Sequence, residues 1–350
     1  MPSTNSTLPE GRRGVLLIAT IVRRAPHALP LAEEAQNASY AHLAALCARR
    51  GIDLYLTHHD NLAGATRALA WAWRDGAWQC EGVPLSEMAL CYADLPENFS
   101  GARDFRRALA VHPITLVNDL RLSDLLTDKL ATYQRFPDHV PPTWIADEPG
   151  LDDRLRGLRL HHDLDVDRIV LKPRYGERGR GIFVIEADHL LTHPALGSSN
   201  YVAQAFLETG SGIPALGLRG RHDLRLIVRH GEIVLAFARL PAAGSYIANC
   251  SAGGHEIPLD VADLPVDAVR LAAAVDARLS AFGPRLYSLD LGVGQSGKFW
   301  IYELNTMPGI VWDEALPVNK AMHATMHQIV ADWLDAASRP TPAAVLAAPS

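Results

Sequence analysis

Hydrophobic residues in the first third of the chain follow two alternating patterns. The continuous apolar runs GVLLIATIV and IDLYLT predict buried strands, whereas SYAHLAALCARRG between them carries apolar residues at helical spacing. WAWRDGAWQCEG predicts a hairpin with its turn at Asp75–Gly76, because Asp-Gly suits the backbone of a tight hairpin turn. This alternation favours a small, mainly parallel sheet flanked by helices, which often binds a ligand at the carboxyl ends of its strands.

Residues 118–136 show a helical pattern that contains Lys129 and ends before Pro137. Proline lacks a backbone N–H and has a fixed φ, so Pro137, Pro141 and Pro142 prevent the helix from continuing. We therefore expect a junction between domains in this stretch. By itself, one lysine on a helix is usually a solvated side chain.

A glycine-rich, basic loop joins two predicted strands within residues 167–186. Backbone N–H groups of glycines can approach phosphates closely, and flanking cations add positive charge. The glycines are Gly176, Gly179 and Gly181, and the cations are Lys172, Arg174, Arg178 and Arg180. The loop lacks GK[ST] and leads into a strand rather than a helix, so it is neither a P-loop nor a dinucleotide fingerprint. A phosphate-binding loop is one interpretation, and a flexible basic hairpin is the other.

Charged and amide side chains recur in the segments that follow. NYVAQAFLE predicts a strand that ends in an exposed acidic residue, and RHDLRLIV and EIVLAFARLP predict a pair of strands. Asp223 and Arg225 share a face of that pair, and Arg239 lies near its end. Residues 244–254 are glycine-rich and contain Asn249. Arginines at strand ends beside such a loop can clamp phosphate or carboxylate oxygens, although they can equally form surface ion pairs.

The hairpin predicted within residues 288–309 carries three side chains with oxygen donors. Glu303 and Asn305 alternate along one strand and so share a face, and Asp290 lies on the partner strand. Carboxylate and amide oxygens are the hard donors that Mg²⁺ prefers. The hairpin therefore predicts a Mg²⁺ site, unless the three residues simply line the solvent face of an ordinary hairpin.

Composition restricts the partners of the chain. Its 350 residues are 48% hydrophobic and 21% charged, which is typical of a globular protein with two or three lobes. A formal net charge of -6 without a run of Lys or Arg argues against nucleic-acid binding. The four cysteines are scattered, which is typical of reduced thiols in the cytoplasm. The apolar run near the N-terminus is too short to span a membrane, and the last residues, rich in Ala and Pro, predict a loose tail.

The order of these motifs resembles that of the ATP-grasp ligases over about residues 118–312. The motifs run DKL, KP with the glycine loop, QxF, DxR, ARLP…N…AGG and LDL…YELNTMPG. ARLPAAGSYIANCSAGG is similar to the corresponding run of bacterial glutathione synthetases. The DxR pair resembles that of ribosomal-protein glutamate ligases, and ELNTMPG resembles that of D-alanine–D-alanine ligases.

The resemblance implies an α/β (α+β) protein with an ATP-grasp fold and an N-terminal α/β domain before it. The N-terminal lobe has the expected size and position but contains no diagnostic motif. The implied parts are an N-terminal substrate-side domain (1–118), a central subdomain with the phosphate loop (119–203), a C-terminal subdomain with the metal site (204–337) and a flexible tail (338–350).

The resemblance also implies roles for individual residues. The lysines would hold the ATP phosphates, the glycine loop would close over them, the QAFL backbone would bind adenine, and the glutamate after it the ribose. These nucleotide-binding residues are Lys129, Lys172, Gly176, Gly179, Gly181, Gln204, Ala205, Phe206, Leu207, Glu208 and Asp223. The residues that would hold Mg²⁺, as two ions with Mn²⁺ as a substitute, are Asp290, Glu303 and Asn305. The residues around the transferred phosphoryl group and the acyl phosphate would be Arg225, Arg239 and Asn249.

An ATP-dependent ligase reaction follows from the resemblance. ATP would activate a small-molecule carboxylate as an acyl phosphate, and an amine of an amino acid or peptide would then form an amide, with release of ADP and phosphate. A cytoplasmic homodimer is the family-level expectation, with neither nucleic acid nor membrane as a partner. The alternatives are an enzyme that stops at phosphoryl transfer or uses a nucleophile other than an amine, and a non-catalytic ATP-binding module.

One departure from the pattern concerns the substrate. Glutathione synthetases and ribosomal-protein glutamate ligases have an arginine two residues before the asparagine of the ARLP…N run, and this chain has Ile247 there. An apolar side chain removes a cationic anchor for an anionic group. The departure therefore predicts a less anionic or more apolar substrate than that of glutathione synthetase.

Overall fold

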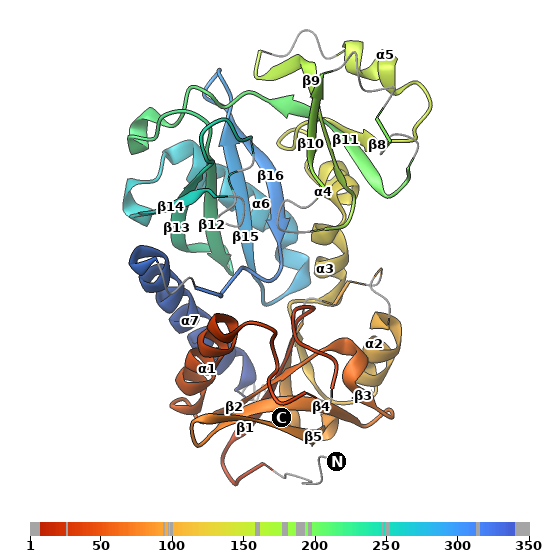
Figure 1. The fold of residues 1–350 in the computed structure, drawn as a ribbon, viewed down its shortest axis with the longest axis vertical. Helices are drawn as coiled ribbons and strands as arrows, with labels where there is room; N and C mark the ends of the chain where they lie inside the picture. Colours follow the sequence, from red (N-terminus) through yellow and green to blue (C-terminus); the bar gives the residue numbers. More distant parts are fainter. Residues whose placement is uncertain are drawn as a thin grey trace, which may run out of the picture. The chain divides into compact units, whose positions relative to one another are not determined.

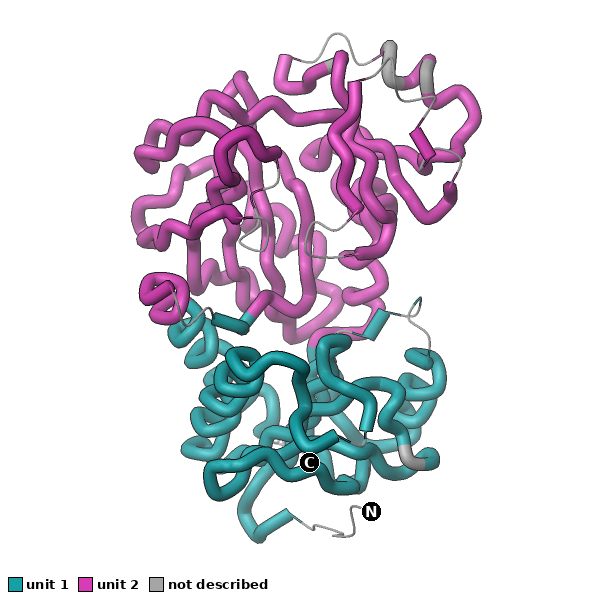
Figure 2. The backbone as a smooth tube through the Cα atoms, viewed as in Figure 1, with its two compact units in different colours: residues 1–117, 310–314, 323–350 teal, residues 118–309, 315–322 magenta. Residues whose placement is uncertain are grey.

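The computed structural model of the protein consists of two compact units (Figures 1 and 2). The described residues are 8–25, 27–93, 95–96, 98, 101–157, 162–176, 181–186, 193–194, 198–246, 248, 253–312 and 316–339. Unit 1 comprises residues 1–117, 310–314 and 323–350, and unit 2 comprises residues 118–309 and 315–322. Within the described part of the chain, no helix combines the length and the apolar character that a membrane span requires.

The sheet of unit 1 grows from the apolar runs near the start of the chain. Its first two strands are parallel and almost wholly buried, which indicates cover on both faces. The order is β3-β4-β2-β1-β6-β7, with β5 beside β4. The parallel pairs β1–β2, β1–β6 and β6–β7 confirm the predicted parallel core. The strands are β1 (Arg13–Ile18), β2 (Ile52–Thr57), β3 (Leu62–Ala63), β4 (Arg67–Arg74), β5 (Ala77–Pro84), β6 (Met88–Ala93) and β7 (Thr115–Val117).

The hairpin predicted around Asp75–Gly76 is confirmed as β4 and β5. Both turn residues have a positive φ, 51° at Asp75 and 80° at Gly76, as a tight hairpin turn requires. The helix predicted after β1 is also confirmed. The helices of unit 1 are α1 (Glu34–Ala48), α2 (Ala102–Ala110) and the later part of α7 (Pro317–Ser338).

Most of the last helix groups with unit 1 and not with the rest of the C-terminal subdomain (204–337) that the resemblance implied. From His323 onward the chain groups with unit 1. Trp333 packs edge-on against Tyr92 of β6, and Arg13 of β1 binds the Asp335 carboxylate at 2.6 Å. An amphipathic helix shows that one face is covered but not which sheet covers it. Residues 340–350, most of the predicted tail, lie outside the described residues.

The described residues of unit 2 form two antiparallel sheets (Figure 1). The four-stranded sheet has the order β10-β9-β11-β8 and the five-stranded sheet the order β14-β13-β12-β15-β16. The strands of the first are β8 (Thr143–Ile145), β9 (Leu164–Pro173), β10 (Phe183–Glu186) and β11 (Tyr201–Leu207). Those of the second are β12 (Asp223–Arg229), β13 (Glu232–Leu240), β14 (His255–Leu259), β15 (Leu286–Val293) and β16 (Phe299–Asn305). The helices of unit 2 are α3 (Leu120–Thr127), α4 (Lys129–Arg135), α5 (Leu151–Arg156), α6 (Val266–Leu279) and the start of α7.

The single helix predicted over residues 118–136 is wrong, because Asp128 divides it into α3 and α4. Asp128 has an extended backbone, and its carboxylate accepts hydrogen bonds from the N–H groups of Leu130 and Ala131 at 3.0 and 3.3 Å. Aspartate favours this capping position, so it begins a new helix instead of continuing the old one. Lys129 therefore lies in the first turn of α4.

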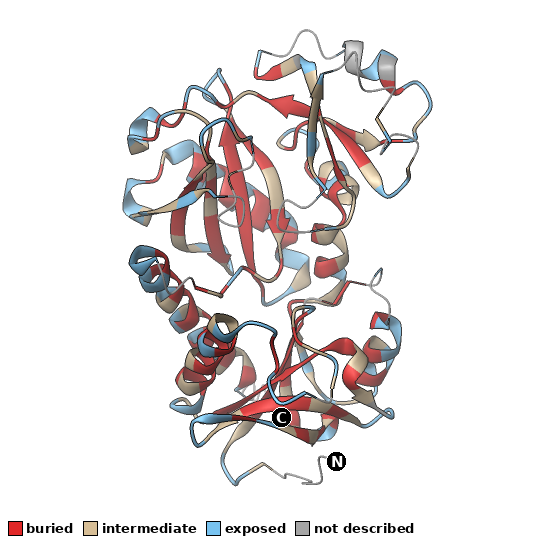
Figure 3. Ribbon diagram, in the orientation of Figure 1, coloured by how far each residue is buried: buried red, intermediate tan, exposed pale blue. Residues whose placement is uncertain are grey.

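The two faces of the five-stranded sheet differ in polarity. On one face Leu224, Leu226 and Val228 of β12 are fully buried and join the core cluster that includes Val275 and Leu279 of α6. Side chains alternate along a strand, so the intervening positions of β12 lie on the other face. Figure 3 shows how far burial extends along β12, β15 and β16. The apolar face packs in the core of unit 2, and the polar face carries the candidate site.

Candidate functional site

The polar face of the five-stranded sheet brings the three predicted metal ligands together. Arg225 of β12 pairs in register with Asp290 of β15, and Asp290 pairs with Glu303 of β16. Asn305 lies two residues beyond Glu303 and pairs with Ser288, so it lies on the same face. Strand order thus places carboxylate and amide oxygens from two adjacent strands beside one another.

Two arginines hold the buried carboxylate of Asp290. Its side chain is 2% exposed. Arg225 donates to its two oxygens at 2.7 and 2.6 Å, and Arg239 donates at 2.7 Å. Burial alone raises the pKa of Asp290, but the charges of Arg225 and Arg239 outweigh burial and hold that pKa below its usual value. Arg239 also binds Asp223, whose pKa is raised by burial against the opposing charge of Arg239.

Three buried polar atoms on this face have no hydrogen-bond partner among the described residues. They are Oγ of Ser288, Oδ1 of Asp223 and Nε of Arg239. Buried polar atoms in native proteins are nearly always hydrogen-bonded. A group of such atoms on one polar face therefore indicates a place where a ligand supplies the missing partners.

Lys129 links the start of α4 to this face. Its Nζ donates to the carbonyl oxygen of Gly176 at 2.7 Å and pairs with Oε1 of Glu303 at 3.2 Å. Arg174, which the sequence placed among the phosphate-binding cations, instead forms a two-pronged ion pair with Asp128, with contacts of 2.6 to 3.0 Å. The cap of α4 and the stem of the glycine loop are thus tied together.

Lys172 is buried between the two sheets of unit 2. Its Nζ donates to Oε1 of Gln204 at 2.7 Å and lies 3.5 Å from the carbonyl oxygen of Tyr302. Burial, aided by the nearby charge of Lys129, lowers the pKa of Lys172 to about 7, whereas Glu303 acts in the opposite direction. The charge of this lysine therefore changes near neutral pH.

Residues 204–207, whose backbone was predicted to bind adenine and which we call the hinge, lie where β11 leaves its neighbour β8. β8 pairs with β11 only as far as Gln204, and the N–H of Ala205 donates to the carbonyl of Pro142 at 2.9 Å. On its other side β11 stays paired with β9 as far as Leu207. The β8-facing backbone edge beyond Ala205 therefore extends past the end of β8. Beside it lies a small apolar cluster that includes Leu207 and Trp300.

The structure adds residues that the sequence reasoning missed around Glu208. Arg168 of β9 donates to Glu208 at 2.9 Å, and its guanidinium lies 4.4 Å from the ring centre of Phe206 and 5.5 Å from that of Tyr246. Arg221 lies 4.4 Å from the centre of the Tyr246 ring. No role was predicted for Arg168, Arg221 or Tyr246, although Tyr246 lies within the run that is similar to bacterial glutathione synthetases. Only the pairing of β9 with β11 and the fold of the loop after β13 bring them to the hinge.

Part of the predicted phosphate loop and clamp lies outside the described residues. This applies to Gly179 and Asn249, and also to Arg178, Arg180 and Ile247. Gly181 is described and has a φ of 71°, where a side chain would be strained. A Cβ there would also lie 3.0 Å from the Tyr201 hydroxyl, so this position favours glycine.

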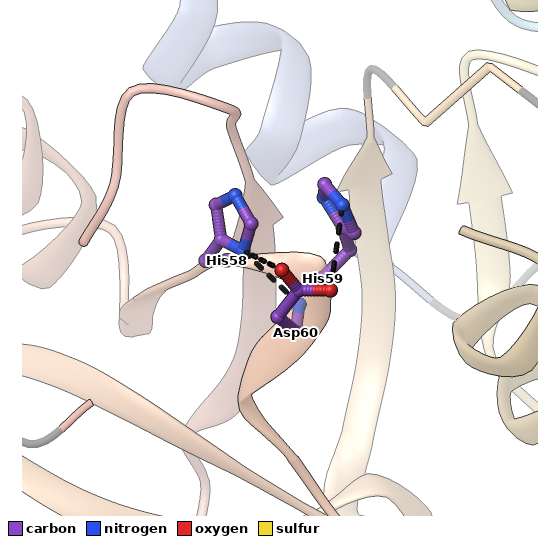
Figure 4. A group of neighbouring side chains, drawn as sticks. All are labelled: His58, His59 and Asp60. Carbon is purple, nitrogen blue, oxygen red and sulfur yellow. Dashed lines mark hydrogen bonds and ion pairs between the residues drawn. The ribbon is translucent and has the colours of Figure 1, made fainter. Parts of the chain in front are cut away.

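A separate group of metal-ligating residue types follows β2 in unit 1 (Figure 4). His58 and His59 lie 3.6 and 3.7 Å from the Asp60 carboxylate, and their rings stack at 4.1 Å. However, the backbone N–H of Asp60 donates to Nδ1 of His58 at 3.1 Å, and Arg24 pairs with the Asp60 carboxylate at 2.6 Å. These bonds already account for the group as the turn that ends β2, so we assign it no metal.

Comparison with known proteins finds matches over the part of the chain that contains most of the candidate site. Residues 128–296 match the family model for the prokaryotic glutathione synthetase, ATP-grasp domain. The glutathione synthetase of Bordetella parapertussis is 31% identical over 173 residues, which cover 47% of this chain and 48% of that protein. The glutathione synthetase of Gloeobacter violaceus is 25% identical over 233 residues, which cover 63% of this chain and 62% of that protein. The match to the Bordetella protein thus spans about half of that relative's length.

Similarity of fold extends over more of the chain. The crystal structure of the D-cycloserine synthetase DcsG superposes with a TM-score of 0.59 and covers 92% of this chain and 99% of that chain, at 16% identity. At this identity the likeness shows the fold alone, and it confirms the predicted α/β ATP-grasp fold. The ATP-grasp domain match of residues 128–296 and the fold of the chain therefore agree.

Proposed function

We propose that the protein is an ATP-dependent carboxylate–amine ligase. It activates a substrate carboxylate as an acyl phosphate and joins it to the amine of an amino acid or peptide, releasing ADP and phosphate. The match of residues 128–296 to the ATP-grasp domain of glutathione synthetases supports this class of reaction. The substrates themselves are proposed only as small molecules.

One observation carries the proposal. On the polar face of the five-stranded sheet, side chains that could bind phosphate pair with side chains that could bind Mg²⁺. Lys129 pairs with Glu303. Arg225 and Arg239 both pair with Asp290. A buried charge that loses its partner is costly, so a ligand with only one sign of charge would leave some of these groups unpaired. A magnesium–nucleotide complex offers phosphate to the cations and the metal to the carboxylates at the same time.

The donor set fits Mg²⁺. Asp290, Glu303 and Asn305 offer only hard oxygen donors from adjacent strands, and Oγ of Ser288 beside them lacks a partner among the described residues. We propose two ions at this face, with Mn²⁺ as a substitute. When bound, Mg²⁺ neutralises charge on the phosphates and so favours phosphoryl transfer.

The cations of the chain contribute positioning and charge neutralisation to the first step. Lys129 and Lys172 bind the phosphates, and Arg225 and Arg239 stabilise charge on the transferred phosphoryl group. The substrate carboxylate is already ionised, so no base is needed. One of its oxygens bonds to the γ-phosphorus as the bond from that phosphorus to the ADP oxygen breaks.

The second step forms the amide. The amine nitrogen bonds to the acyl carbon, the bond from that carbon to the phosphate oxygen breaks, and the amine gives up a proton. Water would hydrolyse the acyl phosphate, so we assign the loop from Gly176 to Gly181 the role of excluding it. Asn249, outside the described residues, is proposed to contact the acyl group.

The nucleotide base is proposed to lie at the hinge. We propose that the 204–207 backbone binds adenine, mainly through its edge beyond Ala205, which extends past the end of β8. Glu208 is proposed to bind the ribose and Asp223 to belong to the same nucleotide site. Because Glu208 pairs with Arg168, binding of ribose requires Glu208 to share or exchange that partner.

The remaining proposals concern organisation and location. We retain a central subdomain (119–203) and a second subdomain that begins at residue 204, with the lobe before them choosing the carboxylate. The free thiols of Cys47, Cys80 and Cys91 and the need for ATP support a location in the cytoplasm. A homodimer is the proposed assembly.

Phosphate release with pooled amino acids and peptides tests the function. A ligase should form ADP only with a matching carboxylate, and hydroxylamine should trap the acyl phosphate as a hydroxamate when the amine is withheld. ADP without a trapped hydroxamate would instead favour an enzyme that stops at phosphoryl transfer. Binding of Mg·ATP without ADP formation in any pool would indicate a non-catalytic module. Substrates less anionic or more apolar than those of glutathione synthetase are expected, given Ile247.

A further inference from the structure

Asn118 is a fully buried residue that connects the two strands of the metal-binding hairpin. Its side-chain NH₂ donates to the carbonyl oxygens of Leu286 at 2.8 Å and of Thr306 at 2.7 Å, and its Oδ1 accepts from the N–H of Leu286 at 2.8 Å. The Asn118 side chain is 0% exposed. Both of its donors and its acceptor oxygen are thus bonded to the backbone at one end of the hairpin.

The position of these bonds relates Asn118 to the metal ligands. Asn305 is the last residue of β16 and pairs with Ser288, so continued pairing would place Met307 opposite Leu286. The amide of Asn118 takes that place by binding both backbone groups of Leu286, and it also holds the carbonyl of Thr306. β16 therefore ends at Asn305 in a defined position.

We propose that Asn118 is a positioning residue that fixes Asn305 relative to Asp290 and Glu303 for metal binding. This inference rests on the proposed function. The ends of strands fray unless their backbone groups are bonded, and a ligand set must hold its oxygens within a fraction of an ångström. Asn118 bonds the backbone at the end of β16 and so keeps that end from fraying. Its amide takes the place of the next pair of strand hydrogen bonds, immediately after the proposed ligand Asn305.

Ser123 provides a second tie on the same segment. Its buried hydroxyl lies 3.4 Å from the hydroxyl oxygen of Thr306. Both ties come from the chain just before and within α3. The proposal therefore predicts that a substitution of Asn118 or of Ser123 weakens metal binding, and that the effect is larger where more hydrogen bonds are lost.

The chain contains a matched control for a purely structural role. Asn37 in unit 1 is also buried, and its amide binds the N–H and carbonyl of Leu31 at 3.1 Å each and the carbonyl of Glu33 at 2.8 Å. Asn37 thus makes the same three bonds to backbone, but it is not part of the ATP-grasp unit. Equivalent substitutions at Asn118 and Asn37 remove the same interactions.

The experiment measures Mn²⁺ binding at saturating ADP by electron paramagnetic resonance, together with thermal stability. Asn118→Asp keeps the acceptor for Leu286 but replaces the NH₂ group, and with it both donors, by one carboxylate oxygen that faces the two carbonyls. We expect it to weaken Mn²⁺ binding at least tenfold, whereas Asn37→Asp lowers the Tm but leaves Mn²⁺ binding within twofold. Ser123→Ala is a milder change that serves as the test if Asn118→Asp does not fold. It should weaken Mn²⁺ binding two- to threefold.

The outcomes separate this inference from the proposed function. Unchanged Mn²⁺ binding in folded Asn118→Asp or in Ser123→Ala, or equal weakening in Asn37→Asp, would overturn the positioning role while leaving the nucleotide site intact. Absence of Mn²⁺ binding to the wild-type protein with ADP would overturn the proposed metal site, and the role of Asn118 with it.

Discussion

Lys172 and Glu303 have properties that follow from their positions rather than from residue type. An ordinary lysine is charged at neutral pH, but Lys172 is buried and its pKa falls to about 7. An ordinary surface glutamate is solvated, but Glu303 pairs with Lys129 beside the doubly paired Asp290. Substitutions of either residue should therefore affect ligand binding more than folding.

ATP binding should depend on pH through Lys172. Below pH 7 the lysine is already protonated, whereas above pH 7 it is largely neutral and would have to take up a proton for the proposed binding of phosphate. ATP affinity should therefore fall as pH rises above about 7. Calorimetry in two buffers of different ionisation enthalpy should show uptake of about one proton at pH 8 and little at pH 6. Lys172→Arg, which stays charged, should show no uptake, and equal uptake by both proteins would assign the proton to another group.

Glu303→Gln should reduce kcat by about 100-fold or more and leave the fold intact, because it removes a charge from the proposed metal-binding face but keeps the shape of the side chain. ADP formation and circular dichroism measure the two effects. Glu232→Gln is a suitable control, since Glu232 belongs to the same sheet and its side chain is 67% exposed. Near-normal turnover in Glu303→Gln would contradict the assignment of Glu303 to the metal.

At the scale of elements, the break between α3 and α4 positions Lys129. Asp128 caps α4 and also binds Arg174 at the stem of the glycine loop. Asp128 directly precedes Lys129, and both residues are bonded to the stem of the glycine loop. The helix cap therefore determines where Lys129 lies relative to the loop. In a continuous helix, the direction of the Lys129 side chain would depend only on its place in the helical repeat.

Asp128→Ala should lower the free energy of unfolding by about 2–3 kcal/mol, of which about 1 kcal/mol is the lost cap and the rest the lost ion pair. It should also weaken ATP binding, because Lys129 and the loop stem lose their common anchor. Asp119 is the matched control, since it caps α3 and pairs with the exposed Arg121. Asp119→Ala should cost about 1 kcal/mol or less and leave ATP affinity unchanged. Urea unfolding and ATP titration distinguish the two, and equal ATP affinities would refute the anchor.

At the scale of the whole molecule, each unit has its own determinants of stability. In unit 1, His327 of α7 is buried, and its Nε2 donates to the carbonyl of Ile310 at 2.5 Å, while Nδ1 lies 2.9 Å from Nδ1 of His42. Burial lowers the pKa of His327 to about 4, although the bond to Ile310 opposes this. The folded state therefore prefers the neutral imidazole.

Mild acid should destabilise unit 1 through His327. The unfolded chain binds a proton near pH 6.5 and the folded chain only near pH 4, so the stabilisation is complete above pH 6.5 and is lost as pH falls toward 4. The expected loss is about 3 kcal/mol. Chemical denaturation at pH 7 and pH 5 should show a smaller difference for His327→Gln than for the wild type. His27→Gln, which changes an exposed histidine of the same unit, should keep the wild-type difference; an unchanged slope in His327→Gln would place the acid sensitivity elsewhere.

Several features could be predicted because they depend on neighbours along the chain. The hairpin at Asp75–Gly76 needs only the backbone preferences of its two turn residues. The shared face of Glu303 and Asn305 needs only the alternation of a strand. The break at Asp128 was missed, although aspartate favours capping positions, because the apolar pattern on both sides of it fits one helix.

The sequence by itself determined the strands, the turns and the residue types of the site, since local backbone preferences and side-chain alternation are properties of short segments. Only the tertiary structure decided which charges meet. β15 returns from distant sequence to pair with β12, and that strand order places Asp290 between Arg225 and Glu303. It likewise brought Asn118 to the end of β16 and α7 to unit 1. Such contacts depend on which buried surfaces fit together, and that information is distributed over the whole chain rather than written in any one motif.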